Sequence, residues 1–123
     1  MHGLDEAELS RLRAALVERA QALSAQLTAE AEAAGARAAS VNENEASPAD
    51  NASARTLNAL VNEAAEHKAA QLRAVKQALA RFENDQYGIC AQCGEAIGLS
   101  RLRARPEARN CIACQTKMEK TRR

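Results

Sequence analysis

Residues 9–34 read LSRLRAALVERAQALSAQLTAEAEAA, and this stretch decides the fold that the sequence predicts. Its apolar residues recur in steps of three and four, which is typical of a helix that packs along another helix. The seam positions are Leu9, Leu12, Leu16, Ala20, Leu23, Leu27, Ala31 and Ala34. We expect a first helix from residue 5 to about 34, weakened at Gly35 and ended within residues 40–48, where no apolar period continues.

A second helix is expected to begin at Pro48. Ser47 is suited to cap its first turn, because serine accepts hydrogen bonds from free backbone amides and proline fits the first helical position. The expected seam positions of this helix are Leu57, Val61, Ala64, Leu72, Val75, Leu79 and Phe82. His67 and Lys68 interrupt the middle of that seam.

Two long helices with a short connection favour an antiparallel hairpin. The chain of 123 residues contains 30 alanines and only two aromatic residues, a composition that favours helices packed through narrow seams over a large core. We therefore expect an all-α fold, with a coiled-coil hairpin in residues 1–84 and its tip near residues 40–52. Residues 85–123 should form a small module with a short terminal helix. A hairpin paired within itself gives no need for a dimer, so we expect a monomer.

Four cysteines form two Cys-x-x-Cys pairs in the second half of the chain. Cys90 and Cys93 make the first pair, and Cys111 and Cys114 make the second, with 17 residues between the pairs. This spacing is typical of a site in which four thiolates surround one zinc ion, leaving no position for a catalytic water. We therefore expect one structural zinc ion and a zinc finger in residues 85–123. A redox-active dithiol pair is the alternative, although no thioredoxin-like strand pattern accompanies the motif.

The charge of the chain is unevenly distributed. The net charge is only +1, yet residues 1–50 carry nine acidic residues against four basic ones. Residues 101–123 carry eight basic residues against two acidic ones. The sequence contains neither a long apolar run nor a basic signal region, so we expect a soluble cytoplasmic protein without a membrane partner.

Three segments closely resemble the DksA/TraR family of zinc-finger transcription factors. They are residues 87–98 (YGICAQCGEAIG), 101–106 (RLRARP) and 111–115 (CIACQ). The resemblance implies a protein that is not an enzyme. It implies a transcription regulator that binds RNA polymerase and inserts its coiled-coil tip into the secondary channel, without reading DNA sequence.

The resemblance also points to residues at the tip. Members of the DksA type carry an Asp-x-x-Asp-x-Ala motif there, whereas residues 47–52 of this chain read SPADNA. Asp50, Asn51 and Ala52 match the second half of that motif, but Ser47 replaces its first acid. Ser47 can still cap a helix, but it contributes no negative charge.

Basic residues of the zinc segment are candidate contacts to the polymerase or to phosphate groups. They are Arg101, Arg103, Arg105 and Arg109. Family members that respond to the alarmone ppGpp use basic residues near the zinc domain. Here Arg105 matches one such position, but Ala74 and Gln115 stand where lysine is frequent, so we expect weak or absent ppGpp dependence.

Two other functions compete with regulation of the polymerase. The four arginines would also suit a zinc-ribbon protein that binds nucleic acid, although the near-zero net charge and the scarcity of stacking aromatics weigh against it. A transcript-cleavage factor would place several acids around a catalytic magnesium ion. A lone Asp50, with only Glu43 and Glu45 nearby in sequence, makes that function less favoured.

Overall fold

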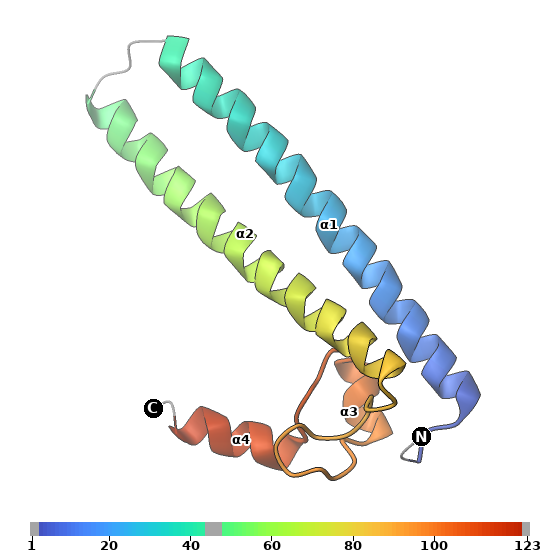
Figure 1. The fold of residues 1–123 in the computed structure, drawn as a ribbon. Coiled ribbons are helices and arrows are strands. Elements are labelled where there is room, and N and C mark those ends of the chain that lie inside the picture. Colours follow the sequence, from blue (N-terminus) through green and yellow to red (C-terminus); the bar gives the residue numbers. More distant parts are fainter. Residues whose placement is uncertain (1–2, 44–47, 122–123) are drawn as a thin grey trace. The chain divides into compact units, whose positions relative to one another are not determined.

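The computed structural model describes residues 3–43 and 48–121, and the side chains of residues 37–43 and 48–51 lie outside the described part. Four helices follow one another along the chain (Figure 1). They are α1 (Glu6–Glu43), α2 (Pro48–Glu83), α3 (Leu99–Ala104) and α4 (Ile112–Thr121). No strand occurs in the described ranges, although Ile89 and Ala96 form one isolated antiparallel bridge. The all-α helical hairpin with a small module after it is therefore confirmed.

The first helix begins at Glu6, next to the expected residue 5, and continues past the expected weak point at Gly35. Asp5 caps it, because its Oδ1 accepts a hydrogen bond of 2.7 Å from the backbone N–H of Glu8. The helix then runs through Gly35 to Glu43. A single glycine disfavours a helix by about 1 kcal/mol relative to alanine. The alanines around Gly35 favour the helix, which is why it does not stop there.

The second helix begins at Pro48, as predicted, and ends at Glu83. Its end is fixed by two backbone hydrogen bonds, from Asp85 to the Phe82 carbonyl (3.4 Å) and from Gln86 to the Arg81 carbonyl (2.9 Å). Asp85 adopts a positive φ of 57°. This pattern is a Schellman motif, in which a left-handed residue reverses the chain and satisfies the last carbonyls.

The chain divides into two compact units, each of which contains an antiparallel pair of segments from α1 and α2. Unit 1 comprises residues 1–20 and 73–123, and unit 2 comprises residues 21–72. Buried apolar side chains of unit 1 come from both long helices and from the loop and helix that follow them. Among them are Leu12, Leu16, Val75, Ala78, Tyr87 and Leu102. Unit 1 therefore has a true apolar core, to which the loop after α2 contributes Tyr87.

The seam of unit 2 differs from the predicted one at several positions. Leu23 is buried, and Leu27, Val61 and Leu72 are half-buried, as expected. The expected seam residues Ala31, Ala34, Leu57 and Ala64 are instead exposed. On α1 the side chain of Glu30 is half-buried, and on α2 Ala65 takes the place expected for Ala64. Four of the eight seam positions predicted for this unit are thus confirmed, and the other four are wrong.

Candidate metal centre

The first two cysteines lie on a loop that folds back on itself after α2. The backbone N–H of Cys90 donates to the Glu95 carbonyl (2.7 Å), and that of Gly94 donates to the Cys90 carbonyl (3.0 Å). Gly94 has a φ of 76°, a conformation that glycine adopts without the strain a side chain would bring. This tight turn brings the side chains of Cys90 and Cys93 to the same side of the loop.

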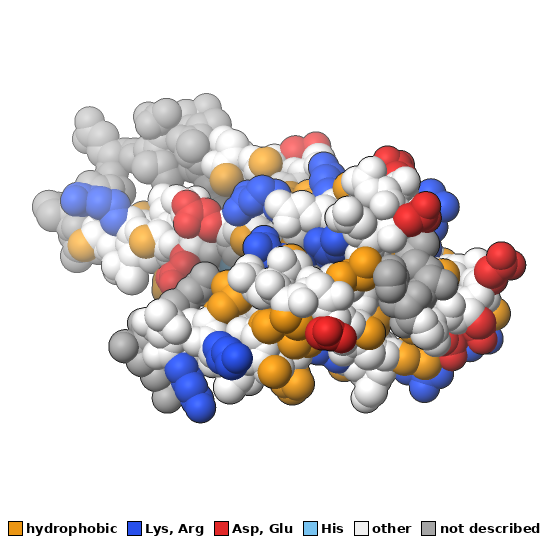
Figure 2. Space-filling model, turned by 60° about the horizontal axis from the view of Figure 1, so that its bottom comes forward, with side chains coloured by type: hydrophobic (Ala, Val, Ile, Leu, Met, Phe, Trp, Pro, Cys, Tyr) orange, Lys and Arg blue, Asp and Glu red, His pale blue; other side chains and the backbone are white. Residues whose placement is uncertain are grey.

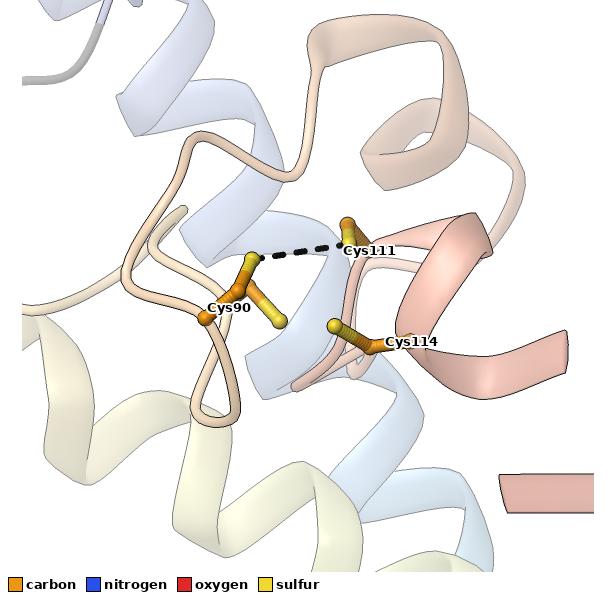
Figure 3. Close-up of side chains that lie close together, drawn as sticks. Cys90, Cys111 and Cys114 are labelled. Carbon is orange, nitrogen blue, oxygen red and sulfur yellow. Dashed lines mark hydrogen bonds between the residues drawn. The ribbon is translucent and has the colours of Figure 1, made fainter. Parts of the chain in front are cut away.

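The other two cysteines stand at the beginning of α4. Cys111 directly precedes the helix and Cys114 lies in its first turn, where the Gln115 N–H donates to the Cys111 carbonyl (2.9 Å). A backbone hydrogen bond from Ala91 to the Arg109 carbonyl (2.8 Å) ties the two cysteine segments together. Figure 3 shows Cys90 on its loop close to Cys111 and Cys114 at the start of α4. Local turns thus place the two cysteines of each pair close together, and the folding of unit 1 brings the two pairs next to each other.

The geometry of the four sulfur atoms fits a tetrahedral zinc ion. Zn–S bonds of about 2.3 Å place neighbouring sulfurs about 3.8 Å apart. Here the Sγ atoms of Cys93 and Cys111 lie 3.8 Å apart, and all four Sγ atoms lie within 4.8 Å of one another. The donor set leaves no place for a fifth ligand, so the site suits a structural ion.

The surroundings of the sulfur atoms favour the thiolate form of Cys90 and disfavour that of Cys114. Burial raises the pKa of the Cys90 thiol, but backbone N–H groups, among them that of Cys111, donate to its sulfur and bring the pKa down to about 6 (Figure 3). The neighbouring thiols of Cys111 and Cys90 raise the pKa of Cys114 to about 12. Four adjacent thiolates repel one another, so a divalent cation is needed to hold all four in the charged form.

A buried junction beside the cysteines was not predicted from the sequence. The Phe82 and Tyr87 rings stack with centroids 3.9 Å apart, and the Tyr87 hydroxyl donates to the Pro106 carbonyl (2.8 Å). Nη2 of Arg81 donates to the carbonyls of Glu107 and Ala108, at 3.5 and 3.4 Å. These contacts join the end of α2 to the segment before Cys111. Only the rarity of tyrosine and phenylalanine in this chain could have drawn attention to the junction.

Electrostatics at this junction follow from burial. Burial, and then the charge of Arg109, lower the pKa of the Arg81 guanidinium from its ordinary value. Burial raises the pKa of Tyr87 to about 12, with Glu107 adding to the rise and Arg81 opposing it. The phenol of Tyr87 therefore stays protonated and remains a hydrogen-bond donor at neutral pH.

The role of Asn110, like that of the junction at Tyr87, was not predicted from the sequence. It is the one buried polar side chain of the described residues, and its Nδ2 donates to Gln115 Oε1 and approaches Met118 Sδ, both at 3.3 Å. Its backbone carbonyl accepts a hydrogen bond of 2.9 Å from Arg101 Nε. Asn110 thus links α3 and α4 directly beside Cys111.

The four arginines predicted as contacts have different surroundings. Arg101 bonds to the Asn110 carbonyl, and Arg103 pairs with Glu8 of α1 at 3.7 Å. Arg105 and Arg109 have exposed side chains. Arg101 and Arg103 thus have partners within the protein, but Arg103, like Arg105 and Arg109, is exposed to solvent. On the face drawn in Figure 2, basic and acidic side chains are interspersed rather than separated.

The predicted tip residues lie largely outside the described part of the structure. Ser47 is not described, and Asp50 and Asn51 are described only as part of the backbone of α2. Ala52 is an exposed residue of the same helix. Among the described residues, no helix is both long enough and apolar enough to cross a membrane.

Comparison with known proteins identifies the cysteine module. The signature of the prokaryotic dksA/traR C4-type zinc finger matches residues 85–120. Together with the clustered sulfurs, this match confirms that the site holds one structural zinc ion.

Similarity extends beyond the zinc finger. The RNA polymerase-binding transcription factor DksA of Caulobacter vibrioides is 40% identical over 81 residues, which cover 66% of this chain and 57% of that relative. The match thus spans little more than half of the relative's length. The structure of DksA2 from Pseudomonas aeruginosa aligns with a TM-score of 0.79 and 30% identity, covering 96% of this chain and 88% of that one.

A more distant structure has the same fold. The RNA polymerase-binding protein and transcriptional regulator Dks of Chlamydia trachomatis aligns with a TM-score of 0.58 at 24% identity, over 96% of this chain and 94% of that chain. The zinc-finger signature, the 30% identity to DksA2 and the agreement of the fold over nearly the whole chain lead to one assignment. The chain belongs to the DksA/TraR family.

Proposed function

We propose that this protein is a transcription regulator that binds RNA polymerase and inserts the connection between α1 and α2 into the secondary channel of the enzyme. The observation that carries the proposal is the likeness to DksA2, which extends over 96% of the chain and includes both long helices. The Caulobacter relative, whose name describes an RNA polymerase-binding transcription factor, adds 40% identity over 81 residues. A protein with this role acts in the cytoplasm, as a monomer and without catalysing a reaction itself.

In this proposal the two parts of the chain have different tasks. Residues 1–84 form the hairpin that enters the channel, with residues 47–52 at its working end. Residues 85–123 form the zinc module that holds the open ends of α1 and α2. The hydrogen bonds of Arg81 to the segment before Cys111 and the stacking of Phe82 on Tyr87 support this division, because they join the last turn of α2 to the zinc module.

The zinc-ribbon function receives less support from the described residues. Arg101 is engaged by the Asn110 carbonyl, whereas Arg103, Arg105 and Arg109 are exposed, and Arg103 also pairs with Glu8. A nucleic-acid interface needs several basic groups that neutralise phosphates together. The mixed charges in Figure 2 do not provide such a surface on that face.

The experiment that tests the proposal is direct binding to purified RNA polymerase. We expect the zinc-loaded protein to bind the core enzyme at a ratio of one to one and to compete with another protein that occupies the secondary channel. Binding to bare duplex DNA, measured at low and at physiological salt, is the matched comparison. Steeply salt-dependent DNA binding without polymerase binding would contradict the proposal and favour the zinc-ribbon function.

We further propose that ppGpp has little effect on this protein. Ala74 offers no charge, and the Gln115 side chain is engaged with Asn110 and Glu119 at 3.3 Å each. Loss of two charge-assisted hydrogen bonds, worth roughly 1.5 to 3 kcal/mol each, would weaken binding at a phosphate site by several kcal/mol. Transcription in vitro with and without ppGpp should therefore give closely similar inhibition or activation curves. A large synergistic shift would mean that other residues form the site.

A further inference from the structure

Both long helices carry a series of residues at every seventh position, and within residues 9–30 of α1 and 54–82 of α2 each series contains a single charged member. On α1 the series is Leu9, Leu16, Leu23 and Glu30. On α2 the series is Ala54, Val61, Lys68, Val75 and Phe82. Every described member is buried or half-buried. Within these two stretches, every member of the series other than Glu30 and Lys68 is apolar.

The two charged exceptions pair with each other in unit 2. Lys68 Nζ forms a hydrogen-bonded ion pair with Glu30 Oε1, and the two side chains are 30% and 32% exposed. The other carboxylate oxygen, Oε2 of Glu30, is buried without a hydrogen-bond partner among the described residues. A half-buried pair with an unsatisfied oxygen contributes little to stability, because desolvation offsets its attraction. Its position in the seam calls for another explanation.

Shifting α1 along α2 by seven residues shows how the ion pair distinguishes the observed register from its neighbours. Sliding α1 by seven residues in one direction would place Leu23 opposite Lys68 and Val61 opposite Glu30. The sequence has no acid within four residues of Leu23 and no base within four residues of Val61. Sliding in the other direction would bring Lys68 to position 37, which is arginine. Apolar layers would meet apolar layers in these registers, but Lys68 would have no acid within reach.

We propose that the Lys68–Glu30 pair sets the register in which α1 and α2 pair, by leaving Lys68 without an acidic partner in either register displaced by seven residues. A single polar position in an otherwise repetitive apolar seam is known to specify register at the expense of stability. The pair acts where the seam is least distinctive. Around it unit 2 offers mainly alanine and half-buried aliphatic side chains, whereas unit 1 has Leu16, Val75 and Tyr87 in its core.

The test measures the distance between spin labels in the full, zinc-loaded chain. Labels are introduced as noncanonical amino acids at the exposed positions Gln21 and Asn58, which avoids chemistry at the zinc-binding cysteines. The wild-type seam should give one narrow distance distribution. The Glu30→Leu/Lys68→Leu double variant should add a second population displaced by up to about 10 Å, since seven helical residues rise 1.5 Å each.

Two further variants make the result specific. The exchanged pair Glu30→Lys/Lys68→Glu restores attraction and should return the single wild-type distribution. The control variant Glu32→Leu/Arg55→Leu removes the same two kinds of charge at exposed positions of unit 2 and should also keep one distribution. Each variant must retain one zinc ion and its helical circular dichroism. A single, unshifted distribution for the Glu30→Leu/Lys68→Leu variant would overturn the proposal, as would failure of the exchanged pair to restore it.

Discussion

Tyr87 is the residue whose surroundings can be read most directly in solution. It is the one tyrosine of a chain without tryptophan, so the absorbance of tyrosinate reports this side chain alone. Burial raises its pKa to about 12 from an ordinary value of about 10. A folded pKa above the unfolded one means that the neutral phenol stabilises the fold. This stabilisation is complete below pH 10 and is lost as the pH rises from 10 to 12.

We therefore predict that Tyr87 of the folded protein titrates near pH 12, together with a loss of stability. Ultraviolet titration at 295 nm measures the ionisation, and denaturant unfolding at pH 8, 10 and 11 measures the stability. In concentrated urea the midpoint should return to about 10. The Tyr87→Phe variant, which leaves the Pro106 carbonyl without its donor, should be less stable by about 1 kcal/mol at pH 8. A folded midpoint near 10 would show that Tyr87 is not buried.

Cys111 tests the zinc site. The Cys111→Ser variant replaces one thiolate by a weaker ligand, so we expect the zinc content to fall well below the one ion per chain of the wild type. Unit 1 should loosen, whereas most of the helical circular dichroism should remain because α1 and α2 contain most of the helical residues. Thr116→Ser, on the exposed side of α4, is the control and should keep its zinc. Full zinc content in the Cys111→Ser variant would contradict the four-cysteine site.

At the scale of elements, the end of α2 depends on a residue in an unfavourable conformation. Asp85 has a φ of 57°, where a residue with a side chain is disfavoured by roughly 1 to 2 kcal/mol and glycine is not. We predict that Asp85→Gly raises the free energy of unfolding by about 1 kcal/mol. The greater conformational entropy of glycine in the unfolded chain opposes this gain and reduces it. Asp85→Val should lower it, because a branched side chain tolerates this conformation poorly.

Chemical denaturation of the zinc-loaded variants measures both effects. Glu83→Gly is the control, since it places glycine in the last helical residue of α2, where the conformation is helical and glycine is unfavourable. That variant should be destabilised. If Asp85→Gly and Glu83→Gly are destabilised equally, the Schellman motif does not fix the end of α2.

At the scale of the whole molecule, the proposed function predicts that binding and activity can be separated at Asp50. Most of the contact area should come from the hairpin and the zinc module, and Asp50 should add one charge near the catalytic centre of the polymerase. Asp50→Asn removes that charge and changes the shape of the side chain little, so it should leave polymerase affinity nearly unchanged. Its effect on promoter-complex lifetime at saturating concentration should be greatly reduced.

Two further variants complete this test. Ser47→Asp restores the acid of the family motif and should strengthen the effect on promoter complexes, because aspartate caps a helix as well as serine does and adds charge. Ala52→Ser changes a neighbouring position without adding charge and is the control. Full activity of the Asp50→Asn protein at saturation would leave Asp50 with no role beyond that of an acid in the first turn of α2.

The sequence alone determined the hairpin, the beginning of α2 at Pro48 and the four zinc-binding cysteines. These features rest on local rules, namely the spacing of apolar residues, the fixed φ of proline and the short reach of a Cys-x-x-Cys turn. They therefore need no knowledge of distant contacts. The end of α1 at Glu43 also lies within the predicted residues 40–48, although the helix continues through Gly35, where a weak point was expected.

Only the tertiary structure decided which side chains face inward and which arginines are already engaged. Leu57 is 53% exposed although its spacing fits the seam, whereas Glu30 and Lys68 share the half-buried seam of unit 2. Arg101 bonds to Asn110, and Arg103 pairs with Glu8, which lies 95 residues earlier in the chain. Whether a charged or apolar side chain is buried depends on the partner it meets across the fold. That partner is set by the packing of segments far apart in sequence, which no local pattern records.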